Sequence, residues 1–131
     1  MADKTSINPF NWHFADDQGV LVTAPTSWLF VSGQTAMSDD GEPQHPGDLR
    51  AQVELTLANV HRVLEAAGMT LSDVVQLNTH VTDVAVFQAG AGKVLDRAFA
   101  AASVSPPGVL SQVSALGHPD LLVEIDAIAV R

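Results

Sequence analysis

The stretch Leu121-Leu122-Val123-Glu124-Ile125-Asp126-Ala127-Ile128-Ala129-Val130 decides the fold. Side chains alternate between the two faces of a strand. One face of this stretch is wholly apolar and suits a core: Leu121, Val123, Ile125, Ala127 and Ala129. The other face mixes apolar residues with Glu124 and Asp126, which makes it too apolar for water and too polar for a core. We therefore expect it to pack against other copies of the chain, with polar groups lining the gaps.

Upstream of this stretch, further segments have the alternation of strands. Residues 73–81 place Val75, Leu77, Thr79 and Val81 on one face, and Gln76, Asn78 and His80 on the other. Two short runs, 20–24 and 28–34, are joined by Pro25-Thr26-Ser27, and we expect them to form a hairpin. Residues 108–113 form a further expected strand, and the turn 116–120 connects it to the last one.

Two segments have the periodicity of helices. Apolar residues recur at steps of three and four from Asp48 to Ala67, with Asp48 as the N-cap and Gly68 as the stop. The second helical segment runs from about Val84 to Ala102, although Gly90 and Gly92 weaken it. Its expected buried residues are Phe87, Val94, Leu95 and Phe99.

The resulting order is β-β-α-β-α-β-β, which predicts a two-layer α+β fold with two helices on one face of a mixed sheet. A chain of 131 residues fits one domain, residues 1–131. Residues 1–18 combine turn formers with Phe10, Trp12 and Phe14. We expect this N-terminal segment to be ordered but irregular, pinned to the surface by its side chains.

Composition excludes several classes of protein. The net charge is −9, and the chain has no cluster of basic residues to neutralise phosphates, so we expect no nucleic-acid partner. There is no cysteine, and the five histidines lack the spacing of metal ligands, so we expect no metal site. No apolar run is long enough for a membrane span, and no signal peptide is recognisable, so we expect a cytoplasmic protein without a membrane partner.

Few residues could carry chemistry. Glu124 and Asp126 point the same way at a spacing of roughly 7 Å, and one of them could hold a water or move a proton. The alternative is that both are solvated or paired with an arginine. His80 shares a face with Asn78 and is expected to be a hydrogen-bonded structural histidine rather than a ligand-binding one. The glycine of Ser32-Gly33-Gln34 indicates a bulge or the close approach of a ligand.

Several segments, in this order and spacing, resemble the RidA/YjgF family over roughly residues 18–131. They are 29–34, the helix 52–68 with Asn59-Val60 and Glu65-Ala66-Ala67-Gly68, Asp73-Val74-Val75, Thr82-Asp83, and 123–129. The resemblance implies a chorismate-mutase-like fold and a homotrimer whose sheets form a central barrel, with ligand clefts between subunits. Deaminases of this family hydrolyse imines and enamines such as 2-aminoacrylate and need no cofactor.

The resemblance also implies a site, from which this sequence departs. In the family a Pro-x-Arg motif leads into the penultimate strand and its arginine binds the substrate carboxylate, while a glutamate in the last strand positions water. Here that motif reads Pro106-Pro107-Gly108, so glycine replaces the arginine, whereas Glu124 and Gly33 carry over. The expected ligand-binding residues are Ser32, Gly33, Phe87, Ala91, Gly108, Val109, Leu110 and, from the N-terminal segment, Phe14.

Two functions follow from this comparison. The first is binding of a small, neutral or weakly charged metabolite in an intersubunit cleft, with Glu124 as the catalytic group that hydrolyses or tautomerises an imine or enamine. Without the arginine, deamination of 2-aminoacrylate itself is not expected. The second is a non-catalytic trimer that binds or senses a small molecule, in which Glu124 serves the interface.

Overall fold

A four-stranded mixed sheet is the centre of the structure, a computed structural model that describes residues 2–131. Its strand order is β3-β6-β4-β5, with β3 at Trp28–Thr35, β6 at Val123–Val130, β4 at Val74–Val81 and β5 at Leu110–Gln112. β6 is antiparallel to both of its neighbours, whereas β5 runs parallel to β4. The predicted mixed sheet is therefore confirmed.

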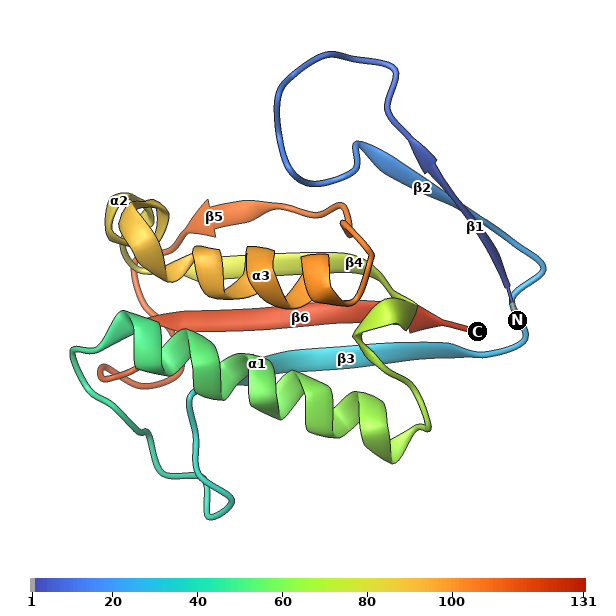
Figure 1. Cartoon of the computed structure of the whole chain (residues 1–131). Helices are drawn as coiled ribbons and strands as arrows, with labels where there is room; N and C mark the ends of the chain where they lie inside the picture. Colours follow the sequence, from blue (N-terminus) through green and yellow to red (C-terminus); the bar gives the residue numbers. More distant parts are fainter. Residues whose placement is uncertain (1) are drawn as a thin grey trace.

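Both long helices cover the same face of this sheet. α1 (Leu49–Ala66) lies over β3 and β6, and α3 (Lys93–Ala101) lies over β4 (Figure 1). The apolar face of β6 packs beneath them, with its alternate residues buried as the sequence predicts. Fully burying a Val, Leu or Ile side chain contributes roughly 1.5–3 kcal/mol, so this layer accounts for most of the hydrophobic stabilisation. No helix within residues 2–131 is long and apolar enough to cross a membrane.

The ends of α1 are set by the residues that the sequence singles out. The carboxylate of Asp48 accepts a hydrogen bond from the Ala51 backbone N–H at 3.0 Å, which caps the first turn. Beyond the last turn, Gly68 has a φ of +71°, a conformation that side chains with a Cβ rarely adopt. The prediction for this helix is confirmed at both ends.

The second helical segment is less regular than a single helix. It consists of α2 (Val84–Val86), a π-helical turn (Phe87–Ala91) and α3. A Cβ on Gly92 would lie 3.0 Å from the ring of Phe87, so the glycine makes room for this buried aromatic side chain. The predicted weakness at the two glycines is thus the place where the helix changes its hydrogen-bond pattern.

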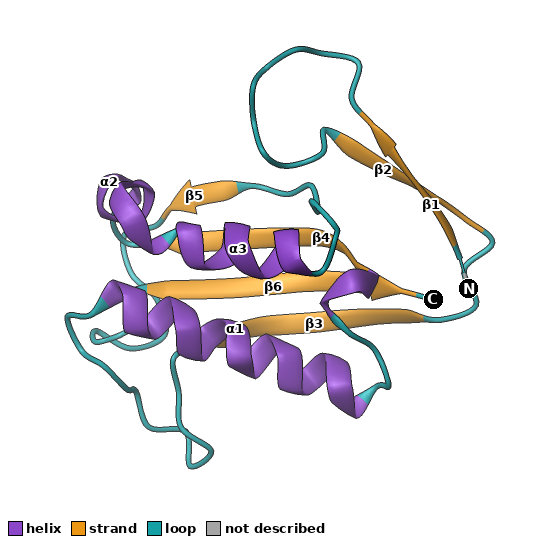
Figure 2. Ribbon diagram, viewed as in Figure 1, coloured by secondary structure: helices purple, strands orange, loops and turns teal. Residues whose placement is uncertain are grey.

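Two predictions for the N-terminal part are wrong. Residues 1–18 are not irregular throughout, because Asp3–Ile7 forms strand β1, which pairs antiparallel with β2 (Gly19–Thr23). The expected hairpin between 20–24 and 28–34 does not form, since β2 pairs with β1 and β3 pairs with β6. Figure 2 shows β1 and β2 as a separate ribbon that projects from the body.

The physical reason for both errors lies in the connection between β2 and β3. Ala24 has a φ of +55°, and the backbone N–H groups of Thr26 and Ser27 donate to the carbonyl of Arg131. The chain is therefore held to the C-terminus instead of folding back on β2. All five residues of β1 are exposed, so no hydrophobic pattern marks this strand in the sequence.

Candidate functional site

Glu124 lies on the face of the sheet that the helices leave open. In the strand pairing it stands opposite His80 of β4 and Thr35 of β3. Its carboxyl group rests against Gly33, where an added Cβ would come within 2.8 Å of the Glu124 Cδ. The register of β3 shifts between Val31 and Gln34, so Ser32 and Gly33 form a bulge. The glycine thus serves both as part of a bulge and as the place where the glutamate approaches the backbone.

A hydrogen-bonded polar cluster lies beside Glu124 on the same face. The Nε2 of His80 is 3.2 Å from Oδ2 of Asp126, and its Nδ1 is 2.8 Å from the Ser111 hydroxyl. The Asn78 amide donates to Oδ1 of Asp126 at 2.9 Å. The prediction that His80 is hydrogen-bonded is confirmed, and Asp126 pairs with a histidine and an amide instead of an arginine.

Most of the predicted ligand-binding residues line one cavity at the β5 edge of the sheet. This cavity has a volume of about 510 Å³. Its predicted members are Phe14, Phe87, Gly108, Val109 and Leu110. Phe14 enters it from the loop between β1 and β2 and is 75% exposed. The structure therefore brings these predicted residues from three distant segments to one place.

The same cavity contains charged groups that the sequence reasoning missed. Asp16, Lys93 and Asp96 line it. Partial burial raises the pKa of the Asp16 carboxyl above its usual value, and the negative charges of Asp96 and Asp17 raise it further. Asp16 and Asp96 are far apart in the sequence, so no local motif could have revealed that they meet.

Gly108, the residue at the position that the resemblance gives to the arginine, has no space for a side chain. A Cβ built there would lie 1.7 Å from the carbonyl oxygen of Leu77. On the same side, the Val109 backbone N–H donates to Oδ1 of Asn78 at 3.2 Å. Any residue larger than glycine would therefore require the backbone to move.

A second cavity, of about 670 Å³, lies at the opposite edge of the sheet, along β3. Gly33, Asn59 and Arg62 are among its lining residues. The Nη1 of Arg62 is 2.6 Å from Oδ1 of Asp39, and this contact lowers the pKa of the Asp39 carboxyl and raises that of the Arg62 guanidinium. The guanidinium at this edge is therefore already engaged by a carboxylate of its own chain.

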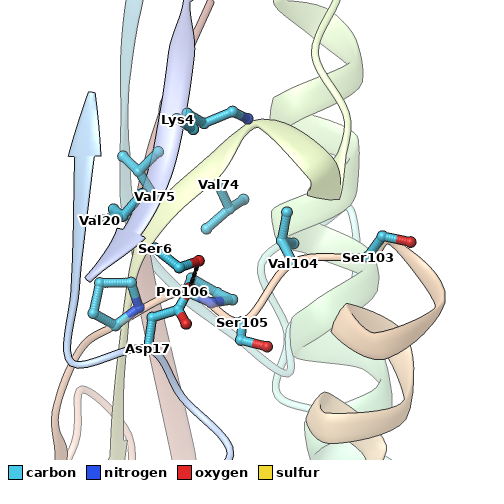
Figure 3. A pocket seen from close by; sticks show the side chains of 11 residues that line it. Lys4, Ser6, Asp17, Val20, Val74, Val75, Ser103, Val104, Ser105 and Pro106 are labelled. Atoms are coloured by element: carbon cyan, nitrogen blue, oxygen red, sulfur yellow. Dashed lines mark hydrogen bonds between the residues drawn. The ribbon is translucent and has the colours of Figure 1, made fainter. Parts of the chain in front are cut away.

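The remaining features fall outside these two cavities. Ala91, a predicted ligand-binding residue, is buried in the π-helical turn and does not line the cavity at β5. A third cavity, of about 340 Å³, separates the β1–β2 hairpin from the body, and there the Ser6 hydroxyl donates to Asp17 (Figure 3). None of its lining residues belongs to the predicted site. Within residues 2–131, no three His, Asp or Glu side chains gather in a way that could hold a metal ion.

The predicted site is thus divided between two edges of one sheet. Glu124 contacts Gly33 near the β3 edge, while Phe14, Phe87, Gly108, Val109 and Leu110 lie at the β5 edge. β6 and β4 lie between these two edges. A single copy of the chain does not join the two groups.

Comparison with known proteins identifies the family. The family model described as Endoribonuclease L-PSP matches residues 18–131. The RutC family protein YjgH of Escherichia coli is 33% identical over 85 residues, a segment that covers 63% of each chain. The chain therefore belongs to the RidA/YjgF family, as the sequence predicts.

Solved structures show the same fold. A Rid family protein, YyfB from Yersinia pestis, superposes with a TM-score of 0.83 at 30% identity, over 98% of both chains. The structure of E. coli TdcF with bound serine has a TM-score of 0.71 at 30% identity, and the match covers 96% of this chain and 91% of TdcF. The two-layer α+β architecture is thus the chorismate-mutase-like fold of this family.

Proposed function

We propose that three copies of the chain form a homotrimer with a central barrel, and that a small metabolite binds in a cleft between adjacent copies. We further propose that the chain hydrolyses or tautomerises an imine or enamine, with Glu124 as the base that positions water. The observation that carries it is the division of the site between the β3 and β5 edges of one sheet.

This division favours a cyclic oligomer. In a ring, the β3 edge of one copy meets the β5 edge of the next, because head-to-tail contacts join different surfaces of the same chain. Such a contact would bring Glu124 and Gly33 of one copy toward the cavity at the β5 edge of its neighbour. The exposed aromatic side chains of the open face, Trp28 and Phe30, also favour coverage by another copy.

The proposed reaction uses the groups of this chain alone and no cofactor. The Glu124 carboxylate takes a proton from water as the water oxygen attacks the carbon of the C=N bond. The proton then passes to the nitrogen, which gives a carbinolamine. Glu124 next moves the hydroxyl proton to the amine, the C–N bond breaks as the C=O bond forms, and ammonia leaves while a carbonyl compound remains. In tautomerisation, the same carboxylate would move a proton between carbon and nitrogen.

The ligand is proposed to be neutral or weakly charged. Gly108 has no space for a carboxylate-binding side chain, and the β5 cavity is lined largely by apolar residues, with two carboxyl groups, Asp16 and Asp96, against one amine, Lys93. Negative charge in a cavity opposes the entry of an anion. The solved structure of TdcF contains serine, which carries a carboxylate. A simple 2-imino acid also carries a carboxylate, and we expect it to bind poorly in the cavity of this chain.

A second candidate is a non-catalytic trimer that binds or senses a small molecule. The observation in its favour is that the Glu124 carboxyl group packs directly on Gly33. A carboxylate held in this way could serve the interface alone.

The absence of a nucleic-acid partner and the cytoplasmic location remain predictions. The net charge of −9 supports the first of these two predictions.

The test compares Glu124→Gln with the wild-type chain. The probes are the neutral imine freshly formed by enzymatic oxidation of butylamine, and 2-aminoacrylate. We expect the wild type to accelerate ammonia release from the neutral imine, and Glu124→Gln to lose about 100-fold or more while its mass in solution is unchanged. Glu54→Gln, at an exposed glutamate on α1, is the control and retains the rate.

Two outcomes would contradict the enzymatic proposal. If the wild type releases no more ammonia from either imine than a blank reaction does, the reaction is rejected. If Glu124→Gln dissociates the oligomer, Glu124 is an interface residue and the binding function is favoured.

A further inference from the structure

The cavity at the β5 edge contains charged groups that the proposed chemistry does not use. Asp16 lines it from the loop between β1 and β2, and Lys93 and Asp96 line it from α3. Within residues 2–131, none of these three side chains takes part in an ion pair. The two carboxyl groups and the amine are therefore available to a molecule that enters the cavity.

Backbone and side-chain contacts hold Asp16 at the cavity. The backbone N–H of the next residue, Asp17, donates at 2.8 Å to the carbonyl of Ser105, which lines the same cavity. The Asp17 carboxylate also accepts hydrogen bonds from the Ser6 hydroxyl at 2.6 Å and the Asn8 amide at 2.9 Å. These contacts fix the end of the loop against the body of the protein, so Asp16 has a defined place beside the cavity.

The charge of the cavity favours a cation. Two carboxyl groups stand against one amine, so the sum of the charges is negative. Burial raises the pKa of the Asp16 carboxyl, and the negative charges of Asp96 and Asp17 raise it further. A raised pKa means that the surroundings oppose the ionised form of Asp16. A cation in the cavity would relieve this repulsion, whereas an anion would increase it.

A buried hydroxyl in the same cavity is an independent sign of a ligand. Thr79 of β4 lines the cavity and is 6% exposed. Its backbone N–H donates to the carbonyl of Val109 at 2.9 Å, but its hydroxyl has no hydrogen-bond partner within residues 2–131. The lack of a partner is unfavourable for a buried polar group. A polar group of a ligand would supply the missing partner.

The remaining walls of the cavity are mainly apolar. Phe87, Leu95 and Phe99 are buried residues of the helical segment, and all three line the cavity. The faces of aromatic rings attract ammonium groups, and their carbon atoms pack against hydrocarbon chains. The volume of about 510 Å³ is within the usual range for small-molecule sites. The cavity thus combines apolar walls with carboxyl groups and a hydroxyl.

We propose that the β5 cavity binds an aliphatic primary ammonium compound with a hydrogen-bonding group at its other end. The ammonium group pairs with Asp16 and Asp96, the hydrocarbon chain lies along Phe87, and the other polar group contacts the Thr79 hydroxyl. The inference rests on the proposed function, because it assigns the charge of the ligand in the same cleft. In the proposed reaction, the substrate would then be an imine or enamine that carries an ammonium group away from the reacting carbon.

The guanidinium at the opposite edge of the sheet is a weak competitor for this place. Arg62 lines the cavity along β3, the edge that meets β5 of the next copy in the proposed ring. Its Nη1 is already 2.6 Å from Oδ1 of Asp39 in its own chain. Pairing with Asp16 or Asp96 of a neighbour would require this contact to break, so a ligand is the better partner for the carboxyl groups of the cavity.

The experiment is isothermal titration calorimetry on the full chain at pH 7 and physiological salt, with 6-aminohexanol, hexylamine and 6-hydroxyhexanoate as probes. The first two are cations at this pH, and the third is an anion of similar length. We expect one 6-aminohexanol per chain, and binding of 6-hydroxyhexanoate that is weaker by about tenfold or more. Asp16→Asn and Asp96→Asn should each weaken the binding of 6-aminohexanol by about tenfold. Asp40→Asn, at an exposed aspartate outside the cavity, removes the same charge from the chain and should bind as the wild type does.

The Thr79 hydroxyl is tested with Thr79→Val, which keeps the shape of the side chain. In the wild type, 6-aminohexanol should bind more tightly than hexylamine, because only the first has a hydroxyl for Thr79. Thr79→Val should remove this difference. Thr56→Val is the matched control, since the buried Thr56 hydroxyl also lacks a partner but lies outside the cavity, and this variant should retain the difference.

The inference is overturned if no ammonium probe binds, if 6-hydroxyhexanoate binds as tightly as 6-aminohexanol, or if Asp16→Asn and Asp96→Asn both bind like Asp40→Asn. Because binding is measured without turnover, this inference and the proposed reaction fail separately. Hydrolysis of the neutral imine without ammonium binding would leave the proposed reaction standing. Ammonium binding without any hydrolysis would leave the present inference standing.

Discussion

The two faces of the sheet are built from the same strands but differ in what completes them. On the face covered by α1 and α3, apolar side chains of β6 and α1 are buried within one copy of the chain. On the open face, Phe30 is 70% exposed and Trp28 is 54% exposed, and their rings stack at 6.3 Å. The covered face is complete in a single chain, whereas the open face has the composition of a surface that another copy covers.

Polar groups also behave differently on the two faces. On the covered side, Gln52 is fully buried and tied to its own chain: its amide lies 2.7 Å from the Asp120 carbonyl, and its Oε1 accepts from the Leu122 N–H at 2.8 Å. On the open side, the Ser111–His80–Asp126 cluster retains partial exposure. Buried polar groups in the first case fix the fold within one copy, whereas those in the second remain partly exposed until another copy covers them.

The largest effect is expected from Gln52→Leu on the covered side. The substitution removes contacts to the carbonyls of Gln44, His45 and Asp120 and leaves the Leu122 N–H without its acceptor. Because each buried polar group without a partner costs about 1–3 kcal/mol, we expect the free energy of unfolding to fall by roughly 3 kcal/mol. Urea denaturation at fixed protein concentration measures it.

The control for this variant lies on the other face. Gln76 is exposed on β4, so Gln76→Leu should change the free energy of unfolding by less than about 0.5 kcal/mol. Equal losses in the two variants would break the contrast between the faces.

An intermediate effect is expected from Gly108→Ala at the edge strand. The new Cβ would meet the Leu77 carbonyl oxygen at 1.7 Å, so β5 must move away from β4. We expect a loss of about 2 kcal/mol, comparable to the overpacking of a core. Thermal melting of the variant measures this loss. Gly117→Ala, where an added Cβ meets no atom within 4 Å, should be close to neutral in the same measurement. If Gly108→Ala melts like Gly117→Ala, the edge is loose enough to accept a side chain.

The smallest effect on the single chain is expected from Phe30→Ser on the open face. Its side chain contributes little within one copy because it is exposed, so the cost should fall on association instead. We expect the oligomer to dissociate at least about tenfold more easily, equivalent to 1.4 kcal/mol. Light scattering across a dilution series measures this, with the exposed Val86→Ser on α2 as the control. Equal dissociation of the two variants would mean that Phe30 on the open face contributes no more to association than Val86 on α2 does.

Much of the fold could be predicted because its signals are local. The alternation of residues 121–130, the Asp48 cap and Gly68 each act within a few residues, and the structure confirms them. The N-terminal errors have a different origin, since β1 is exposed and its pairing with β2 depends on backbone hydrogen bonds. The direction of the chain after Ala24 is set by contacts to Arg131, which are distant in sequence.

The candidate site could be predicted only in part. The resemblance supplied Glu124, Gly33 and the cavity residues at β5, and the structure places Glu124 on Gly33 and five of the others in one cavity. The meeting of Asp16 with Asp96, and of Ser111 with His80, joins residues from separate elements. No spacing in the sequence encodes such contacts, because they depend on how the strands are ordered in the sheet.

The measurement that tests the central claim most directly is the mass of the wild-type chain in solution, by size-exclusion chromatography with light scattering. The open face and the divided site both require other copies of the chain. We predict three times the 13.8 kDa of one chain, about 41 kDa, maintained on dilution. A mass of 13.8 kDa would contradict the account, because neither the open face nor the site at the β3 and β5 edges would then be completed.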